Sequence, residues 1–397
     1  MKNPLKSLPY LGQSVWLDNL CRNLITSGEL KRLIEEDGLR GLTSNPSIFE
    51  KAIAGSSDYR DQLEAPASQG LDAKALYESI AVRDIQDAAD ILRPVYLESK
   101  GRDGFVSLEV SPLLAHEMQG TLEEGRRLWR TVARENLMIK VPATPEGIPA
   151  FQQLISEGIN VNVTLLFARE TYAQVAAAYL SGLESRLRQG GDLSKVASVA
   201  SFFISRIDTA ADNWITGRLK LSRDSGEQAR LRSVLGRVAN ASAKNAYQKY
   251  IEIYHEDRWQ ALVRLGARTQ RLLWASTGTK NPNYSDVIYV EELIGPDTVN
   301  TMPPATLEAF RDHGRARLTL ARNVEEAISI MDLVEQIGIP FKELTDKLLD
   351  DGVKQFTDAF GKLLKAVGRN GKGTDHDQVE FLRLELMKGL YQEQHHR

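Results

Sequence analysis

Two charged residues lie inside apolar segments of the sequence, where ions are rarely found. Glu109 stands in Phe-Val-Ser-Leu-Glu-Val and Lys140 in Leu-Met-Ile-Lys-Val-Pro, so both are flanked by apolar residues. Such side chains are almost never fully buried unless they are paired, and an unpaired buried ion costs several kcal/mol. The two residues are therefore either a structural ion pair or parts of a reactive site, and the pattern alone leaves both readings open.

A lysine in such a place suggests covalent chemistry with ketones. A lysine amine has an ordinary pKa of about 10.4, and an apolar pocket disfavours the charged form and yields a nucleophile. The amine can form a Schiff base, whose iminium accepts electrons when a neighbouring C–C bond breaks. The reaction also requires a proton shuttle and a base. Glu109 and Asp18, on other predicted strands, are the available carboxylates.

Several other chemistries find no support in the sequence. The six histidines form no His-x-x-x-His or His-Glu-x-x-His arrangement, and the single cysteine, Cys21, cannot build a thiolate site, so we expect no metal. Neither a Gly-x-Ser-x-Gly elbow nor a Walker sequence occurs. A formal net charge of −3 gives no case for nucleic acid or an anionic membrane. One cysteine and no signal-like apolar stretch predict a cytoplasmic protein.

Short apolar runs recur along the chain and alternate with helical patterns. Continuous apolar runs are typical of parallel strands buried on both faces. The runs are Val15–Leu17, Leu39–Thr43, Phe105–Val110, Leu137–Val141, Ile159–Phe167, Val196–Ile204, Leu272–Ala275 and Thr298–Met302. The helical patterns include Pro112–Val132, Ile148–Glu157 and Arg169–Arg188. About eight strands alternating with helices predict an α/β protein with a (β/α)₈ barrel. The competing doubly wound sheet lacks a Gly-x-Gly-x-x-Gly after any strand candidate.

Two regions exceed the bare barrel. Residues 209–268 are predicted to hold two or three helices, and residues 304–397 are almost entirely helical in pattern. Neither region is set off by a linker rich in Pro, Gly or Ser. We therefore expect one domain over residues 1–397, a (β/α)₈ barrel with extra helices.

The carboxyl ends of barrel strands carry the chemistry, because their loops meet over a packed interior. We therefore collected the polar residues that lie within or just after each apolar run. They are Asp18, Thr43, Ser44, Asn45, Ser107, Glu109, Lys140, Asn160, Asn162, Thr164, Ser201, Arg206, Ser276, Thr277 and Lys280.

Six of these segments, in order, resemble the signatures of transaldolases. The matching strings cover about residues 11–310, and six in the family's order form a specific pattern. They are GLTSNPSIF at 41–49, IKVPAT at 139–144, GINVNVTLLF at 158–167, SFFISRID at 201–208, WASTGTKN at 274–281 and DTVNTMP at 297–303. The resemblance implies a (β/α)₈ barrel without a cofactor that transfers a dihydroxyacetone unit between ketose and aldose phosphates in the non-oxidative pentose phosphate pathway.

The resemblance also assigns the reaction steps to residues. Lys140 would attack the ketone of fructose 6-phosphate or sedoheptulose 7-phosphate. Glu109 would act as acid and base when the carbinolamine loses water, through a water molecule held by Thr164. Asp18 would accept the hydroxyl proton as the C3–C4 bond breaks, and would return it to the product formed with glyceraldehyde 3-phosphate or erythrose 4-phosphate.

Substrate binding is implied at further positions. Asn45, Asn162 and Ser201 would hold the three-carbon unit, and Phe203 would form a wall of its pocket.

The phosphate is implied to lie at two segments. Arg206 matches the family's phosphate arginine, whose planar fork suits phosphate oxygens; an ordinary ion pair with Asp208 or another acid is its alternative. At the second segment shorter members carry a serine-aromatic-arginine string. This chain has Ser276, Thr277 and Lys280 instead, which looks like the longer bacterial branch.

Two other functions stay open at this point. A class I aldolase would use the same lysine but release the three-carbon unit, and the length of the chain favours transfer. A barrel that only binds phosphosugars is the non-enzymatic alternative. The expected partners are sugar phosphates, with neither nucleic acid nor membrane, and we expect a monofunctional monomer or homodimer.

Overall fold

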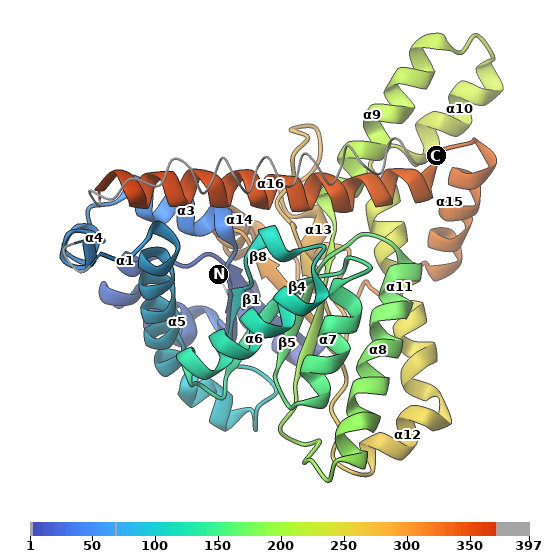
Figure 1. Cartoon of the computed structure of the whole chain (residues 1–397). Coiled ribbons are helices and arrows are strands. Elements are labelled where there is room, and N and C mark those ends of the chain that lie inside the picture. Colours follow the sequence, from blue (N-terminus) through green and yellow to red (C-terminus); the bar gives the residue numbers. More distant parts are fainter. Residues whose placement is uncertain (1–2, 68–69, 371–397) are drawn as a thin grey trace, which may run out of the picture.

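Eight parallel strands close into a barrel in the computed structural model, which describes residues 3–67 and 70–370 (Figure 1). The strands are β1 (Gln13–Asp18), β2 (Gly41–Thr43), β3 (Phe105–Glu109), β4 (Leu137–Pro142), β5 (Val161–Leu166), β6 (Ser198–Phe203), β7 (Arg271–Ala275) and β8 (Thr298–Met302). Each strand pairs with the next, and β8 pairs with β1. The predicted (β/α)₈ barrel is therefore confirmed, and each predicted apolar run overlaps one strand.

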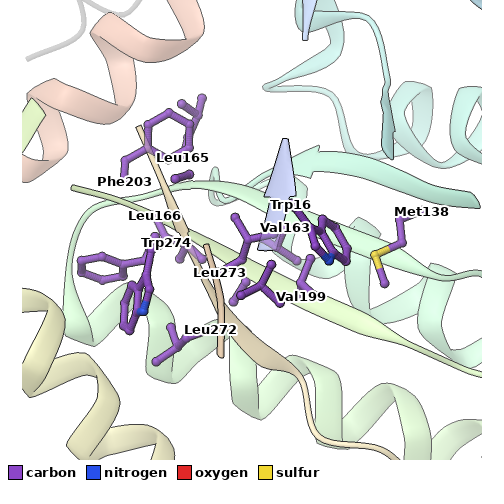
Figure 2. Packing of buried hydrophobic residues seen from close by; sticks show 14 of the residues in the cluster. Trp16, Met138, Val163, Leu165, Leu166, Val199, Phe203, Leu272, Leu273 and Trp274 are labelled. Carbon is purple, nitrogen blue, oxygen red and sulfur yellow. The ribbon is translucent and has the colours of Figure 1, made fainter. Parts of the chain in front are cut away.

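The barrel interior is filled by large side chains from facing strands. Figure 2 shows Trp16, Val199 and Leu273 packed together, and all three are buried. The first residue of the shortest strand, β2, is Gly41, and sterics explain why it is a glycine. A Cβ atom at this position would lie 2.5 Å from the Trp16 indole, so the fully buried ring requires a residue without a side chain.

Helices connect the strands and surround the barrel. They are α1 (Arg22–Thr26), α2 (Glu29–Arg32), α3 (Pro46–Gly55), α4 (Arg60–Ala67), α5 (Ala73–Glu98), α6 (Met118–Val132), α7 (Gly147–Ser156), α8 (Arg169–Arg188), α9 (Ser205–Leu221), α10 (Ser225–Val234), α11 (Val238–His255), α12 (Asp257–Val263), α13 (Ile288–Glu291), α14 (Pro304–His313), α15 (Val324–Gln336) and α16 (Phe341–Asn370). Short helical turns occupy Pro4–Ser7, Pro9–Leu11, Leu33–Asp37 and Pro112–Leu114. Among the helices within residues 3–67 and 70–370, none combines the length and the apolar character needed to cross a membrane.

The predicted helices match α7 and α8 closely, whereas the helix predicted over Pro112–Val132 is too long at its start. α6 begins at Met118, after a separate turn over Pro112–Leu114. The backbone oxygens of Leu114 and Ala115 accept hydrogen bonds from the Thr121 and Thr144 hydroxyls. These hydroxyls therefore satisfy two backbone oxygens at the break between the turn and α6.

The segment 209–268 holds four helices where two or three were expected. α9 begins upstream of it at Ser205, and α10, α11 and α12 follow. Short extended breaks separate them; Asp224, for example, caps α10 by accepting a hydrogen bond from the Gly226 backbone nitrogen. Figure 1 shows α9 and α10 reaching beyond the barrel as a pair.

The C-terminal region also differs from a plain barrel. Helices α14, α15 and α16 follow β8, and α16 runs across the end of the barrel where the strands finish (Figure 1). The buried residues of α16 recur every three or four positions, which is the spacing of one helix face. They include Gly352, Phe356, Phe360, Leu363 and Val367. The expected helical continuation over 371–397 lies outside the described residues.

Candidate active site

A cavity of about 580 Å³ opens at the carboxyl ends of the strands, beneath α16. Nine of the twelve predicted site residues line it, and the other three, Glu109, Asn162 and Thr277, lie behind this lining. The nine are Asp18, Asn45, Lys140, Thr164, Ser201, Phe203, Arg206, Ser276 and Lys280.

Lys140 and Glu109 lie opposite each other on adjacent strands. They are register partners in the β3–β4 pair, and Lys140 Nζ lies 3.2 Å from Glu109 Oε2. The two side chains are only 4% and 5% exposed. Lys140 Nζ also donates a hydrogen bond to the Ser44 backbone oxygen at 3.1 Å. Burial raises the pKa of the Glu109 carboxyl, although the positive charge of Lys140 opposes this rise. The carboxyl is therefore suited to holding and releasing a proton beside the amine.

A second carboxylate, Asp18, ends strand β1. Its Oδ1 accepts a hydrogen bond of 2.6 Å from the Thr43 hydroxyl, which lies 2.8 Å from the Thr301 hydroxyl. Burial raises the pKa of Asp18, and the charge of Lys140 and the Thr43 hydrogen bond oppose the rise. Such a carboxylate is a stronger base near neutral pH than a solvated one.

Three buried polar atoms around the cavity have no hydrogen-bond partner among the described residues. They are Thr164 Oγ1, Glu109 Oε2 and Arg206 Nη1. Glu109 Oε2 is paired with the charge of Lys140 at 3.2 Å, but this contact lacks hydrogen-bond geometry. Buried polar groups in proteins are nearly always hydrogen-bonded, so unsatisfied groups require an explanation. Their position at the cavity leaves them able to bond a molecule that enters it.

Asn162 supports the cavity from behind. It is the register partner of Lys140 in the β4–β5 pair and is fully buried. Its amide nitrogen donates to Ser107 Oγ at 3.1 Å, and its oxygen accepts from Ser201 Oγ at 2.6 Å. In this structure Asn162 therefore orients Ser201, which does line the cavity.

Asn45 links the cavity to helix α3. Its side-chain oxygen accepts a hydrogen bond of 3.0 Å from the Ile48 backbone nitrogen, which caps the helix, and Pro46 occupies the first helical position. Because the oxygen is engaged in the cap, the amide nitrogen is the group of Asn45 that can serve a ligand.

Arg206 lies in the first turn of α9, over the Phe203 ring at 5.3 Å. The ion pair with Asp208 that the sequence left open is not formed. Asp208 instead accepts hydrogen bonds from the Ala239 backbone nitrogen and the Tyr289 hydroxyl, both at 2.8 Å. Helix α9 begins without a side-chain cap. A guanidinium beside an uncapped helix N-terminus is well suited to an anion.

In the second predicted phosphate segment, two of the three named side chains line the cavity and the third does not. Ser276 has a left-handed backbone (φ 54°), and its hydroxyl lies 3.0 Å from that of Ser205, which joins this loop to the start of α9. Lys280 is exposed at the cavity rim. Thr277 faces the other way: it is fully buried and donates to Asn300 Oδ1 at 3.1 Å. Its hydroxyl is used to hold the loop on β8, so the predicted contribution of Thr277 to phosphate binding stays a prediction that its side-chain direction does not support.

Some lining residues were not singled out from the sequence. Phe356 of α16 places its ring 5.5 Å from Lys140 Nζ, and Lys51 of α3 and Thr301 of β8 also line the cavity. Thr301 could have been found from the sequence, because it is a polar residue within a predicted strand. Phe356 lies far along the chain in an ordinary amphipathic pattern, so nothing local marked it.

The chemistry available here is that of amine, carboxyl and guanidinium groups. Within residues 3–67 and 70–370, no group of three or more His, Cys, Asp or Glu residues is arranged to hold a metal ion. The arrangement can form an imine at Lys140, move protons through Glu109 and Asp18, and bind an anion at Arg206.

Comparisons with known proteins agree with this geometry. The family model described as transaldolase/fructose-6-phosphate aldolase matches residues 15–367. The chain is similar to a transaldolase of Trichodesmium erythraeum, with 50% identity over 92% of this chain and 97% of that protein. It is also similar to transaldolase 2 of Nostoc punctiforme (49% identity, 92% and 97% covered) and to a transaldolase of Thiobacillus denitrificans (46%, 92% and 100%). The chain therefore belongs to the transaldolase/fructose-6-phosphate aldolase family.

Proposed function

We propose that Lys140 is the Schiff-base nucleophile with which this enzyme transfers a dihydroxyacetone unit between sugar phosphates. The chain is a transaldolase of the pentose phosphate pathway. The alternative of a barrel that only binds phosphosugars is thereby set aside. Sedoheptulose 7-phosphate and fructose 6-phosphate are the proposed donors, and glyceraldehyde 3-phosphate and erythrose 4-phosphate the proposed acceptors.

The proposed covalent steps begin with attack of the Lys140 amine on the donor ketone carbon, which gives a carbinolamine. Glu109 donates the proton with which the hydroxyl leaves as water, and an iminium forms on Lys140. A water molecule held by Thr164 would carry this proton, in agreement with Thr164 Oγ1 and Glu109 Oε2, neither of which forms a hydrogen bond within the described residues.

In the second half of the proposed reaction Asp18 accepts the proton of the donor's C4 hydroxyl. The C3–C4 bond then breaks, its electrons pass into the iminium, and the aldose phosphate leaves while an enamine stays on Lys140. The enamine carbon attacks the acceptor aldehyde, Asp18 returns the proton, and water releases the new ketose. The hydrogen bond from Thr43 would fix the position of Asp18.

Binding is proposed to divide between the two sides of the cavity. Asn45 and Ser201 would hold hydroxyls of the three-carbon unit, with Asn162 behind Ser201 and Phe203 as a wall. Arg206 would bind the phosphate together with the N-terminus of α9, and Ser276 and Lys280 would close the site at its rim.

One observation carries the proposal: a buried Lys140 amine lies 3.2 Å from Glu109 on the wall of a cavity whose other lining includes Arg206, a cation with an unpartnered buried nitrogen. The two groups allow one molecule to be held covalently by its ketone and ionically by its phosphate.

Borohydride reduction with fructose 6-phosphate tests this proposal. We expect a reduced dihydroxyacetone adduct on the peptide that contains Lys140, identified by mass mapping, and none on a Lys140→Arg variant. An adduct on another residue, or no adduct on the wild-type enzyme, would contradict the proposed mechanism.

The family description also covers aldolases, which release the three-carbon unit instead of transferring it. Turnover of fructose 6-phosphate with and without erythrose 4-phosphate separates the two activities. We expect glyceraldehyde 3-phosphate to appear rapidly only when the acceptor is present. A cytoplasmic location and a monomeric or homodimeric state stay predictions.

A further inference from the structure

Helix α16 contributes an aromatic ring to the neighbourhood of the reactive lysine. Phe356 lines the catalytic cavity, is 4% exposed, and places its ring centroid 5.5 Å from Lys140 Nζ. The other close neighbours of this nitrogen are the Ser44 backbone oxygen and the Glu109 carboxylate. The amine is thus surrounded by two oxygen acceptors and the face of a ring.

The position of this ring is fixed on both sides along the helix. One turn before it, Gly352 lets α16 approach β5, because a Cβ atom there would lie 2.8 Å from Leu165 Cδ2. Leu165 itself has a left-handed backbone (φ 61°) and follows Thr164 directly. One turn after it, Phe360 packs edge-on against Tyr77 with ring centroids 5.6 Å apart. Packing therefore leaves the Phe356 ring little freedom to move away from Lys140.

A ring in this position distinguishes between the states of the nitrogen. The face of an aromatic ring carries negative electrostatic potential and attracts a cation within about 6 Å of its centroid. The attraction is stronger in a site without water. The amine that attacks the ketone and the carbinolamine that it forms are neutral at nitrogen, whereas the iminium is a cation. An interaction with the charged nitrogen therefore lowers the free energy of the iminium relative to these two neutral states.

We propose that the Phe356 ring stabilises the cationic Schiff-base nitrogen on Lys140 and so determines how much of the bound donor is held as iminium. This inference rests on the proposed Schiff base at Lys140. It makes α16, which follows the last barrel strand, part of the reaction site rather than a cover alone.

The test is borohydride trapping at a series of fructose 6-phosphate concentrations, without acceptor, on Phe356→Leu. Leucine keeps an apolar side chain and removes the ring. We expect the concentration that gives half-maximal trapping to rise about 2- to 30-fold, the range expected for a lost cation–π interaction. Phe356→Tyr, which keeps the ring, should trap like the wild type.

Phe360→Leu is the matched control, because it makes the same change one turn away on the same buried helix face. It should lower the thermal unfolding temperature of the enzyme but leave half-maximal trapping unchanged. If Phe360→Leu shifts trapping as much as Phe356→Leu does, the effect belongs to the placement of α16 and the inference is wrong.

Replacement of Phe356 by trifluorophenylalanine addresses the ring's electrostatics with the fold preserved. Fluorine withdraws charge from the ring face without removing the ring, so we expect trapping to weaken in the same direction. Unchanged trapping in this variant and in Phe356→Leu, with normal adduct formation on Lys140, would overturn the inference and leave the proposed function intact. Absence of the adduct from the wild-type enzyme would overturn both.

Discussion

A buried ion pair lies at each end of the barrel, and the two pairs are built differently. At the carboxyl end of the strands Lys140 meets Glu109 at 3.2 Å, with side chains 4% and 5% exposed. At the amino end Arg271 meets Asp103 at 2.9 Å, with side chains 5% and 11% exposed. Burial and distance therefore do not distinguish the two pairs.

Hydrogen bonding does distinguish them. Asp103 accepts bonds from the Ser14 hydroxyl at 2.8 Å and the Trp16 indole at 3.3 Å, and Arg271 also donates to the Ser14 hydroxyl and the Arg102 backbone oxygen. In the other pair Glu109 Oε2 has no hydrogen-bond partner among the described residues.

A fully bonded pair holds strands together, whereas an incompletely bonded pair beside a cavity can still react. This agrees with the general division of (β/α)₈ barrels, in which one end supports stability and the other carries catalysis. Three predictions separate the two roles by measuring activity and unfolding on the same variants, and a fourth concerns the phosphate side of the cavity.

The largest effect is expected for Lys140→Ala. Loss of the nucleophile should lower kcat by about 10⁴-fold or more, on the order seen when a covalent nucleophile is removed. Because Glu109 can take up a proton once its partner is gone, the free energy of unfolding should fall far less than the activity. Steady-state transfer assays and urea unfolding measure the two quantities. A Lys140→Arg variant that retains more than a small fraction of activity would contradict the nucleophile assignment.

Glu109→Gln should lower kcat by about 10²- to 10⁴-fold, the usual range for a lost acid–base group. It should also alter the pH dependence of stability. The unfolded carboxyl titrates near its ordinary pKa of 4.5, and burial raises the pKa of the folded one. Between the two values the folded protein binds more protons, so its free energy of unfolding falls as pH rises.

The glutamine variant should lack this part of the fall. Its stability relative to the wild type should therefore increase as pH rises above 4.5, and should become constant above the folded pKa. Urea unfolding at a series of pH values checks the sign. A wild-type enzyme that gains stability over the variant in this range would mean that Glu109 is stabilised as a carboxylate, as a structural pair requires.

Arg271→Met should show the reverse pattern. It leaves Asp103 buried without its cation, so we expect a loss of about 3–5 kcal/mol in the free energy of unfolding with kcat of the folded enzyme unchanged. Arg102→Met is the control, because Arg102 is half-exposed and its ion pair with Asp297 should contribute less than about 1 kcal/mol. A large fall in kcat for folded Arg271→Met would mean that the lower pair also serves the reaction.

The smallest effects are expected at the phosphate side. Arg206→Met should lower kcat/KM about 10- to 150-fold, equivalent to the 1.5–3 kcal/mol of a charged hydrogen bond. Lys280→Met should lower it less than about 5-fold, because an exposed charge is screened by water. Raised salt should reduce the Lys280 contribution first. Equal losses for the two variants would place the phosphate nearer the rim than we propose.

Much of the fold was predictable because its signals are local. Parallel strands buried on both faces appear as continuous apolar runs, so each run predicted from the sequence overlaps one strand of the barrel. The same property made Lys140 and Glu109 visible, since a charge within such a run is conspicuous. The start of α6 was missed in part because the Ala115 backbone oxygen at the break is satisfied by the Thr144 hydroxyl, a tertiary contact that the local pattern does not contain.

The candidate site was predictable only in part. Ordered sequence signatures named its residues, and nine of the twelve line the cavity. They did not reveal that Asn162 lies behind Ser201 or that Thr277 turns toward β8. The direction of a loop side chain depends on what lies across the fold, and the spacing of residues along the chain does not contain that information.

The sequence by itself determined the strands, their order and the two charges placed within them, because apolar runs and the charges inside them are properties of a few consecutive residues. Tertiary structure decided which buried charges have all their hydrogen bonds within the protein, as Arg271 and Asp103 do, and which can still bond a ligand. It also brought Phe356, from a helix beyond the last strand, to within 5.5 Å of Lys140. An amphipathic pattern shows only that one face of a helix is buried; the packing of α16 against the barrel decides what that face covers.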